Sequence, residues 1–146
     1  TQEVAGHLKA MAEDDPDVTS IVVDDTGVGG GVTDRLNEEN VAGGRVRIVP
    51  FNGGEKARRP DRYVNAIAEA WLELGQAFRD GMIDIDDNPS VIAQLSARRY
   101  TVQGDRRLKL ESKDDFKKRS STGGSPDDAD ALAMCYAAPG PGVGVW

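Results

Sequence analysis

Residues 21–32, IVVDDTGVGGGV, hold the feature that most restricts the fold of this chain. Three β-branched apolar residues run directly into two carboxylates, Asp24 and Asp25, and four glycines follow within five residues, from Gly27 to Gly31. An unbroken apolar run of this kind is typical of a strand in a parallel sheet. Ligands of open α/β sheets bind beyond the carboxyl ends of such strands, so a strand that ends on acids marks a candidate site.

Two kinds of phosphate-binding loop begin in the same way as this glycine loop. A dinucleotide-binding turn would use Gly27 and Gly29, but its third glycine position holds Val32, and the two acids would repel a pyrophosphate. A Walker loop requires a Gly-Lys-Ser/Thr sequence, which does not follow here. A metal site fits better, because Mg²⁺ is usually held by one or two carboxylates together with phosphate and water.

A metal site needs further carboxylates, and residues 125–136, SPDDADALAMCY, contain them. Asp127 and Asp130 are three residues apart and therefore share one face of a predicted helix, while Asp128 points away. Acids in a first helical turn also complement the helix dipole. That alternative explains Asp127 and Asp128, but it gives no reason for an acid at Asp130 beside an apolar run.

The remaining elements follow from hydrophobic periodicity and capping signals. The predicted elements are helices over 2–13, 32–40, 63–82, 88–97 and 126–137, strands over 18–23 and 45–51, a hairpin over 100–110 and a basic helical turn over 113–119. We expect Ile21–Val23 and Val46–Val49 to be adjacent parallel strands, with Trp71 and Phe78 of the long helix packed across them. Two core strands make a small sheet, so either the hairpin joins it or strands precede Thr1.

The charge of the chain is unevenly distributed. The 146 residues carry a net charge of −7, which argues against nonspecific nucleic-acid binding by the whole surface. Residues 98–119 contain nine basic and four acidic side chains, a local balance of +5 that leaves −12 for the rest. This asymmetry indicates one basic contact surface, although a solvated hairpin and helix would give the same pattern. No apolar run reaches the roughly 20 residues of a membrane span, so we expect no membrane partner.

Three motifs together resemble a known family. They are VVDDTGVG at residues 22–29, RYTVQGDRRLKLESKDD at residues 99–115 and SPDDADALA at residues 125–133. In this order and spacing they resemble the C-terminal nuclease domain of tailed-phage or prophage terminase large subunits. The resemblance runs from Thr1 to about Ala138. It implies an α/β, RNase H-like (resolvase/integrase-type) sheet flanked by helices, with an added β-hairpin.

The resemblance also implies an activity. It is that of an endodeoxyribonuclease that cuts concatemeric double-stranded DNA during genome packaging, with two Mg²⁺ or Mn²⁺ ions as cofactors. One family acid ends the strand before a TGVG-like loop and matches Asp24 better than Asp25. Another family acid begins the final helix and matches Asp127. Asp130 matches an acid used in some relatives. The implied catalytic and metal-binding residues are therefore Asp24, Asp127 and Asp130. The basic residues expected to grip the DNA backbone are Arg106, Arg107, Lys109, Lys113 and Lys117.

The family pattern contains parts that this sequence lacks. The first family acid sits on an opening strand that would precede Thr1, and no ATPase half with Walker motifs is present. We therefore expect residues 1–138 to be a nuclease-domain fragment without its first strands and first acid, followed by a flexible Pro/Gly tail over 139–146. In the full-length protein the implied partners are an ATPase domain, the small terminase and the portal, in the host bacterial cytoplasm.

Two other classes of function remain open. Another RNase H-like enzyme, such as a transposase, integrase or Holliday-junction resolvase, would share the acids and the fold. A non-catalytic α/β binding module would carry the same acids as solvated surface groups. A saturable Mn²⁺ site distinguishes the module from both enzymes, and substrate specificity separates the two enzymes.

Overall fold

The structure is a computed structural model that describes residues 2–27, 30–121 and 124–138. The chain forms two compact units, one built from residues up to Asn52 and the other from Gly53–Ala137. The predicted tail over 139–146 lies outside the described residues. None of the described helices combines the length and the apolar character that crossing a membrane would require.

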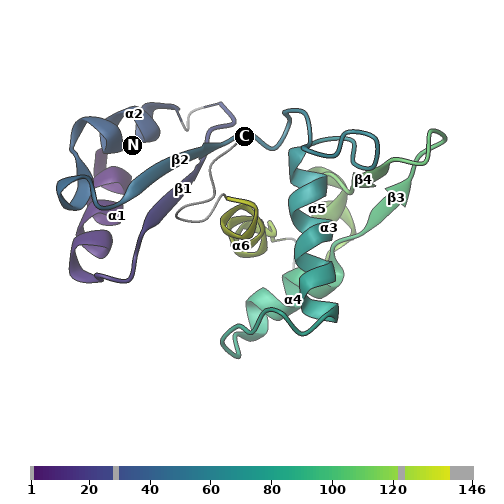
Figure 1. The fold of residues 1–146 in the computed structure, drawn as a ribbon. Coiled ribbons are helices and arrows are strands. Elements are labelled where there is room, and N and C mark those ends of the chain that lie inside the picture. Colours follow the sequence, from purple (N-terminus) through teal and green to yellow (C-terminus); the bar gives the residue numbers. More distant parts are fainter. Residues whose placement is uncertain (1, 28–29, 122–123, 139–146) are drawn as a thin grey trace. The chain divides into compact units, whose positions relative to one another are not determined.

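The first unit is a parallel pair of strands with two α-helices on one side (Figure 1). Its elements are α1 (Gln2–Asp14), β1 (Ser20–Asp24), α2 (Gly30–Glu38), the 3₁₀ helix η1 (Val41–Gly44) and β2 (Arg47–Phe51). The strands pair in parallel with Ile21 opposite Ile48 and Asp24 opposite Phe51. The expectation of adjacent parallel strands is therefore confirmed.

One face of β1 forms the core of this unit. Ile21 and Val23 are buried and pack with Ala5, Leu36 and other residues of the two helices. Val22 lies between them on the opposite face and is only half-buried, so the strand is not fully buried on both faces as its unbroken apolar run suggested. Asp24 continues the alternation and shares the face of Val22, away from the helices.

Arg45 fixes the end of α1 against the beginning of β1. Its guanidinium donates hydrogen bonds to the carbonyl oxygens of Ala12 at 2.7 Å, Pro16 at 2.9 Å and Val18 at 2.6 Å. The last carbonyls of a helix have no intrahelical partner, so the planar fork of one arginine satisfies groups that would otherwise need water. Arg45 thus ties the approach to the acid-bearing strand to the preceding helix.

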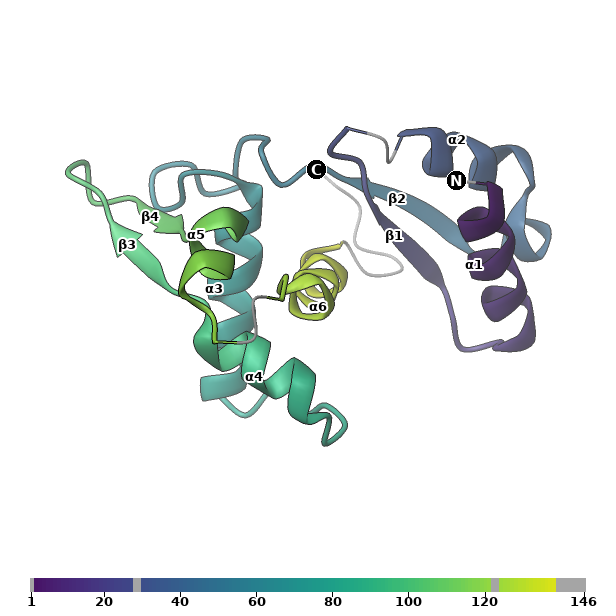
Figure 2. The ribbon, with the colours of Figure 1, turned by 180° about the vertical axis from the view of Figure 1, so that it is seen from behind.

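The second unit consists of four helices and an antiparallel hairpin, seen from behind in Figure 2. Its elements are α3 (Ala66–Arg79), α4 (Pro89–Ala97), β3 (Tyr100–Val102), β4 (Leu108–Leu110), α5 (Lys113–Arg119) and α6 (Asp127–Ala137). The Asn88 side chain caps α4 by accepting from the N–H groups of Ser90 and Val91, as its position before Pro89 predicted. The predicted long helix over 63–82 is shorter, because Asn65 caps its start and Gly81, at φ 68°, follows its end.

Small residues allow α3 and α6 to pack closely. Ala68 of α3 and Ala129 and Ala133 of α6 are fully buried, and Trp71 is buried beside them with its indole N–H donated to α6. Trp71 therefore contacts α6 within its own unit. The expected packing of Trp71 and Phe78 across β1 and β2 joins residues of different units and stays a prediction.

The hairpin is anchored to the segment before α3. Its turn closes with the Arg106 N–H donated to the Gln103 carbonyl at 2.9 Å, and Arg106 takes a left-handed φ of 68°. On the other edge of β4, the Leu108 N–H donates to the Arg62 carbonyl at 2.8 Å, and the Val64 N–H donates back to the Leu108 carbonyl at 3.0 Å. Backbone hydrogen bonds therefore join the hairpin to residues 62–64.

Removing the Arg45 fork should destabilise the first unit. We expect Arg45→Gln to lower the free energy of unfolding by about 1–3 kcal/mol, because several carbonyls lose their charged donor. Urea unfolding followed by circular dichroism measures this change. Lys9→Gln removes the same charge from a surface pair with Glu39 at 3.6 Å and should cost under about 1 kcal/mol. Equal losses in the two variants would contradict the role of Arg45.

Candidate active site

Asp24 is held at the carboxyl end of β1 by its own loop. Its Oδ1 accepts the Thr26 N–H at 3.0 Å, and the next residue extends the strand ladder because the Asp25 N–H donates to the Phe51 carbonyl at 2.8 Å. The Asp24 side chain is exposed. A Gly27 with φ of 91° then turns the chain out of the strand, a backbone conformation that glycine adopts without strain. The sequence therefore presents one carboxylate to solvent where a strand of an α/β sheet ends.

Asp25 has an environment that sequence reasoning did not anticipate. Its Oδ1 is buried and accepts no hydrogen bond from any group of the described residues. A Cβ placed on Gly30, the first residue of α2, would lie only 3.4 Å from this oxygen. A buried carboxylate oxygen without a donor is costly, and a bound cation is one of the few groups that relieves this cost. No sequence signal beyond the second acid of the Asp-Asp pair could have identified it.

The second acid group lies at the start of α6. Asp127 is its first residue, and its Oδ1 accepts from the Ser125 hydroxyl at 2.6 Å and from Lys113 Nζ at 3.0 Å. The hydrogen bond from Ser125, and then that from Lys113, lower the pKa of Asp127 below its ordinary value. The side chain is largely exposed. Asp127 is therefore ionised and accessible.

Asp130 is buried, whereas Asp127 is exposed. Only 5% of the residue is exposed, yet its two oxygens accept from three donors. Oδ1 accepts from the Trp71 indole N–H at 2.7 Å and from Arg98 Nη1 at 3.2 Å, and Oδ2 pairs with Lys113 Nζ at 2.8 Å. The predicted shared face of Asp127 and Asp130 is confirmed, since one lysine contacts both. Asp128 binds Gln94 instead, at 3.0 Å.

Lys113 is the cation between the two acids. Burial by itself lowers the pKa of Lys113, but the hydrogen bonds from its ammonium to Asp130 and Asp127 outweigh that effect and raise the pKa above its ordinary value. The ammonium therefore stays protonated at neutral pH. This position differs from the free phosphate grip that the sequence suggested for Lys113.

Arg98 links the acid group to the hairpin. Its side chain is buried, with the guanidinium 5.1 Å from the Trp71 ring centre and 5.9 Å from that of Phe116. Besides Asp130, it donates through Nε and Nη2 to the Glu111 carbonyl at 2.9 and 2.7 Å. The Glu111 carboxylate in turn pairs with Arg119 at 2.7 Å. Because Glu111 follows β4, the start of α6 and the end of the hairpin are fixed to each other.

The other predicted DNA-binding residues differ in their availability. Arg107 pairs with Asp105 at 2.7 Å inside the hairpin turn, so its charge is largely compensated. Arg106, Lys109 and Lys117 are exposed. None of these three forms a salt bridge with a carboxylate of the described part of the chain. They therefore remain the candidates for contact with phosphate.

The two acid groups belong to different units. Asp24 and Asp25 lie in the first unit, and Asp127 and Asp130 lie in the second. Within residues 2–27, 30–121 and 124–138, no three His, Cys, Asp or Glu side chains converge in a set that could hold a metal ion. The approach of Asp24 to Asp127 stays a prediction.

The chain has structural relatives of known identity. The nuclease domain of the large terminase subunit gp2 of bacterial virus Sf6 superposes with a TM-score of 0.71 and 21% sequence identity, over 93% of this chain and 72% of that one. The chain has the fold of a terminase nuclease domain. A mutant of the Sf6 domain with manganese and beta-thujaplicinol gives a TM-score of 0.73 at 21% identity, over 94% and 73% of the two chains.

A further structure of a mutant Sf6 domain, with calcium, gives a TM-score of 0.70 at 21% identity, over 92% of this chain and 71% of that one. No protein-family model and no curated protein matches the chain. The terminase nuclease fold confirms the RNase H-like α/β class and the added hairpin that the sequence motifs implied.

Asp130 should matter more for stability than its neighbours. In Asp130→Asn the buried Arg98 loses its counter-charge, and breaking a buried ion pair in this way costs about 3–5 kcal/mol. Asp127→Asn and Asp128→Asn change exposed acids on the same turn and should each cost under about 1 kcal/mol. Urea unfolding of the three variants measures the difference. If all three unfolded at the same midpoint, Asp130 would not be the anchor of this region.

The Glu111–Arg119 pair predicts an acid dependence of stability. The hydrogen bond from Arg119 lowers the pKa of Glu111 from 4.5 to about 2. Because the folded-state pKa is depressed, the stabilisation is complete above pH 4.5 and is lost as the pH falls toward about 2. Replacing both partners, in Glu111→Gln with Arg119→Gln, should remove that acid dependence, because the titrating carboxyl is gone. Unfolding free energies measured from neutral pH to pH 2 test this, and identical pH profiles for the two proteins would contradict it.

Proposed function

We propose that this chain is the nuclease domain of a tailed-phage or prophage large terminase subunit, and that it cuts concatemeric double-stranded DNA during packaging. The observation that carries this proposal is that a terminase nuclease fold bears carboxylates at the end of β1 and at the start of α6. The names of the structural relatives support a nuclease, and two of them include manganese or calcium. In the full-length protein an ATPase domain, the small terminase and the portal would be its partners, in the host bacterial cytoplasm.

The residues present fit divalent cations. Carboxylate oxygens are the preferred ligands of Mg²⁺ and Mn²⁺, and the buried Asp25 Oδ1 has no donor among the residues that the structure describes. Asp24 and Asp127, both exposed and placed where the family motifs put catalytic acids, would hold the metal. When bound, two such ions would activate water and stabilise the charge of the scissile phosphate.

Asp130 has a different part in the proposed site. Its oxygens already accept from Trp71, Arg98 and Lys113, which leaves little capacity for a further cation. We assign it the role of positioning Asp127 and Lys113. The Lys113 ammonium reduces the repulsion between the two acids and keeps a positive charge beside Asp127, where a phosphate would approach.

The exposed basic residues would hold the duplex. Arg106 in the hairpin turn, Lys109 on β4 and Lys117 on α5 can each contact a phosphate without reading a base. The hydrogen bonds from Arg98 to the Glu111 carbonyl tie this hairpin to the start of α6. The residues proposed to contact the duplex and the acid at Asp127 therefore belong to the same unit.

The proposal predicts a metal site that depends on exposed acids from both units. Asp24→Ala and Asp127→Asn should each weaken Mn²⁺ binding at least about tenfold, because each removes a charged ligand, and should abolish plasmid nicking in Mn²⁺. Asp128→Asn, on the same helical turn but bound to Gln94, should leave both unchanged. Calorimetric Mn²⁺ titration and gel analysis of nicked plasmid measure the two effects.

Three results would contradict this proposal in different ways. The absence of any saturable Mn²⁺ site would favour the non-catalytic binding module. Binding that survives in Asp24→Ala and Asp127→Asn would place the metal elsewhere. Cleavage of four-way junctions in preference to linear duplex would favour a resolvase-type nuclease of the same fold.

A further inference from the structure

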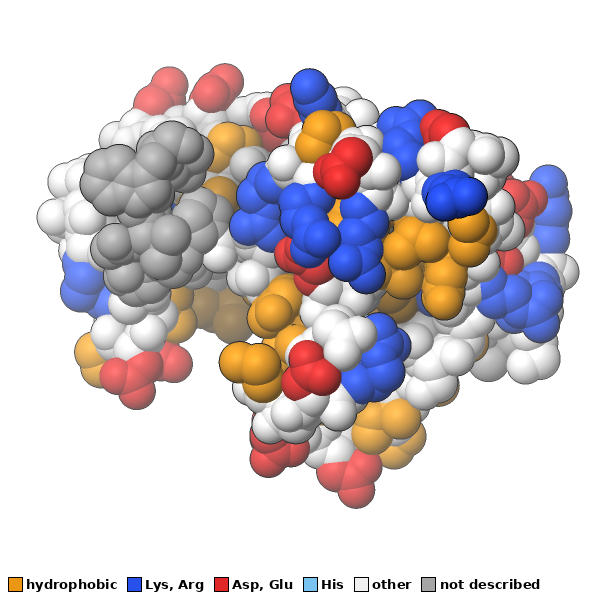
Figure 3. Space-filling view, turned by 45° about the vertical axis from the view of Figure 1, so that its right-hand side comes forward, with side chains coloured by type: hydrophobic (Ala, Val, Ile, Leu, Met, Phe, Trp, Pro, Cys, Tyr) orange, Lys and Arg blue, Asp and Glu red, His pale blue; other side chains and the backbone are white. Residues whose placement is uncertain are grey.

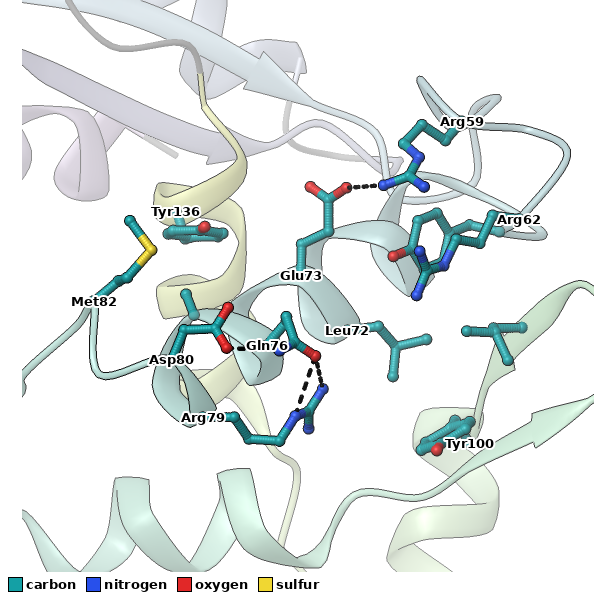
Figure 4. A pocket seen from close by; sticks show the side chains of 13 residues that line it. Arg59, Arg62, Leu72, Glu73, Gln76, Arg79, Asp80, Met82, Tyr100 and Tyr136 are labelled. Carbon is teal, nitrogen blue, oxygen red and sulfur yellow. Dashed lines mark hydrogen bonds and ion pairs between the residues drawn. The ribbon is translucent and has the colours of Figure 1, made fainter.

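The second unit contains a cavity whose lining includes none of the candidate site acids, Asp24, Asp25, Asp127 and Asp130. It has a volume of about 360 Å³ and lies between α3 and the hairpin. Its walls are formed by Leu72 of α3, Tyr100 and Leu108 of the hairpin, and Arg62 from the segment before α3. Figure 4 shows Arg62, Leu72, Arg79 and Tyr100 around this common space.

Positive charge dominates the groups of this cavity that remain available. Three arginines and two acids line it. Glu73 is already paired with Arg58 at 3.0 Å and Arg59 at 3.9 Å, and Asp80 accepts from the Gln76 amide at 2.9 Å. Neither Arg62 nor Arg79 forms a salt bridge with a carboxylate of the described residues. A bond from a neutral amide leaves the charge of Asp80 in place, so two guanidinium groups and one carboxylate of this lining are available to a ligand.

The same cavity offers an aromatic surface. Tyr100 is 55% exposed although it is a large aromatic side chain on a strand. Tyr63 is 3% exposed and has the Arg62 guanidinium 5.6 Å from its ring centre. Figure 3 shows a face of the molecule on which Lys and Arg side chains adjoin hydrophobic ones in several places. Guanidinium groups beside an exposed ring are the pattern that single-stranded nucleic acids bind, through phosphate pairing and base stacking.

Several hydrogen bonds hold the walls of the cavity in place. The buried Glu69 carboxylate accepts from the backbone N–H groups of Arg58 at 3.0 Å and Arg59 at 2.8 Å, which fixes the loop at the rim. The exchange of hydrogen bonds between Leu108 and residues 62–64 fixes Arg62 relative to Tyr100. Gln76 accepts from Arg79 through Nε and Nη2 and so orients its guanidinium. Rigid placement of this kind reduces the entropy lost on binding.

We propose that this cavity binds one unpaired nucleotide of a DNA strand, with the flanking phosphates on Arg62 and Arg79 and the base stacked on Tyr100. The choice of DNA rests on the proposed function. Guanidinium groups bind phosphate oxygens in a bidentate manner, and the volume suits a single base. An unpaired nucleotide is required because the base faces of an intact duplex are covered by neighbouring bases. A frayed end left by strand cleavage would supply one.

Fluorescence anisotropy with a labelled oligothymidylate, in EDTA so that no metal acts, tests the proposal. The double variant Arg62→Gln/Arg79→Gln should reduce the slope of log affinity against log salt by about 1.4, since each lost phosphate contact with a single strand removes about 0.7. Tyr100→Ala should weaken binding about tenfold through the lost stacking, and Tyr100→Phe should restore it. The control Lys9→Gln/Lys56→Gln removes the same charge outside the cavity and should keep the slope. Thermal unfolding verifies that each variant is folded.

A blunt duplex serves as the second probe, because Tyr100→Ala should leave its binding unchanged. The proposal would be overturned if the double variant had the same salt slope as the control. It would also be overturned if Tyr100→Ala left the affinity for the single strand unchanged, or lowered the affinity for the duplex by the same factor. These outcomes are separable from a failure of the proposed nuclease. Suppose that the chain neither binds Mn²⁺ nor nicks plasmid, but that its cavity variants lose single-strand binding. The proposal for the cavity would then stand, and the proposed nuclease function would be refuted. Nicking that depends on Asp24, together with unchanged single-strand binding in the cavity variants, would support the nuclease function and refute the proposal for the cavity.

Discussion

The buried carboxylate of Asp130 is the constraint on which the second unit depends. An ionised carboxylate removed from water is strongly destabilising unless charged partners and hydrogen bonds compensate for the lost solvation. Here the compensation comes from Trp71 on α3, Arg98 after α4 and Lys113 at the start of α5. The carboxylate can be satisfied only when all three elements are in place, so the position of the first turn of α6 is determined together with theirs. The location of Asp127 in the fold is a consequence of this network.

The same network explains why a segment with a large local excess of positive charge is not uniformly a contact surface. Arg98 is used inside the unit, Lys113 between two acids and Arg119 on Glu111. Counting charges along the sequence overestimates what is free to bind phosphate, because a paired guanidinium offers only its remaining donors. What is left is a smaller set at the hairpin and α5, together with Arg62 and Arg79, which lie outside the basic segment and were not predicted from it.

Local patterns gave most of the elements, and long-range contacts account for what they missed. The parallel pairing of β1 with β2, the cap at Asn88 and the hairpin follow from neighbouring residues, and each was predictable. The role of Asp130 was not, because its partners Trp71 and Arg98 are 59 and 32 residues away. The sequence predicted that Asp127 and Asp130 share a helix face, but it did not predict that one lysine contacts both.

The two acid groups differ in how their charge is balanced, and this difference bears on the proposed chemistry. At the start of α6, Lys113 pairs with both carboxylates and Arg98 pairs with Asp130, so two cations balance the two acids by folding alone. At the end of β1, no Lys or Arg of the described residues pairs with Asp24 or Asp25, and one oxygen of Asp25 is buried without a donor. Adjacent carboxylates repel one another, and the unsatisfied buried oxygen adds a desolvation cost at Asp25. A cation therefore has more to stabilise at the end of β1 than at α6. The first unit therefore has the stronger electrostatic demand for a metal ion, and the second holds an already balanced acid beside the basic residues that we propose to contact DNA.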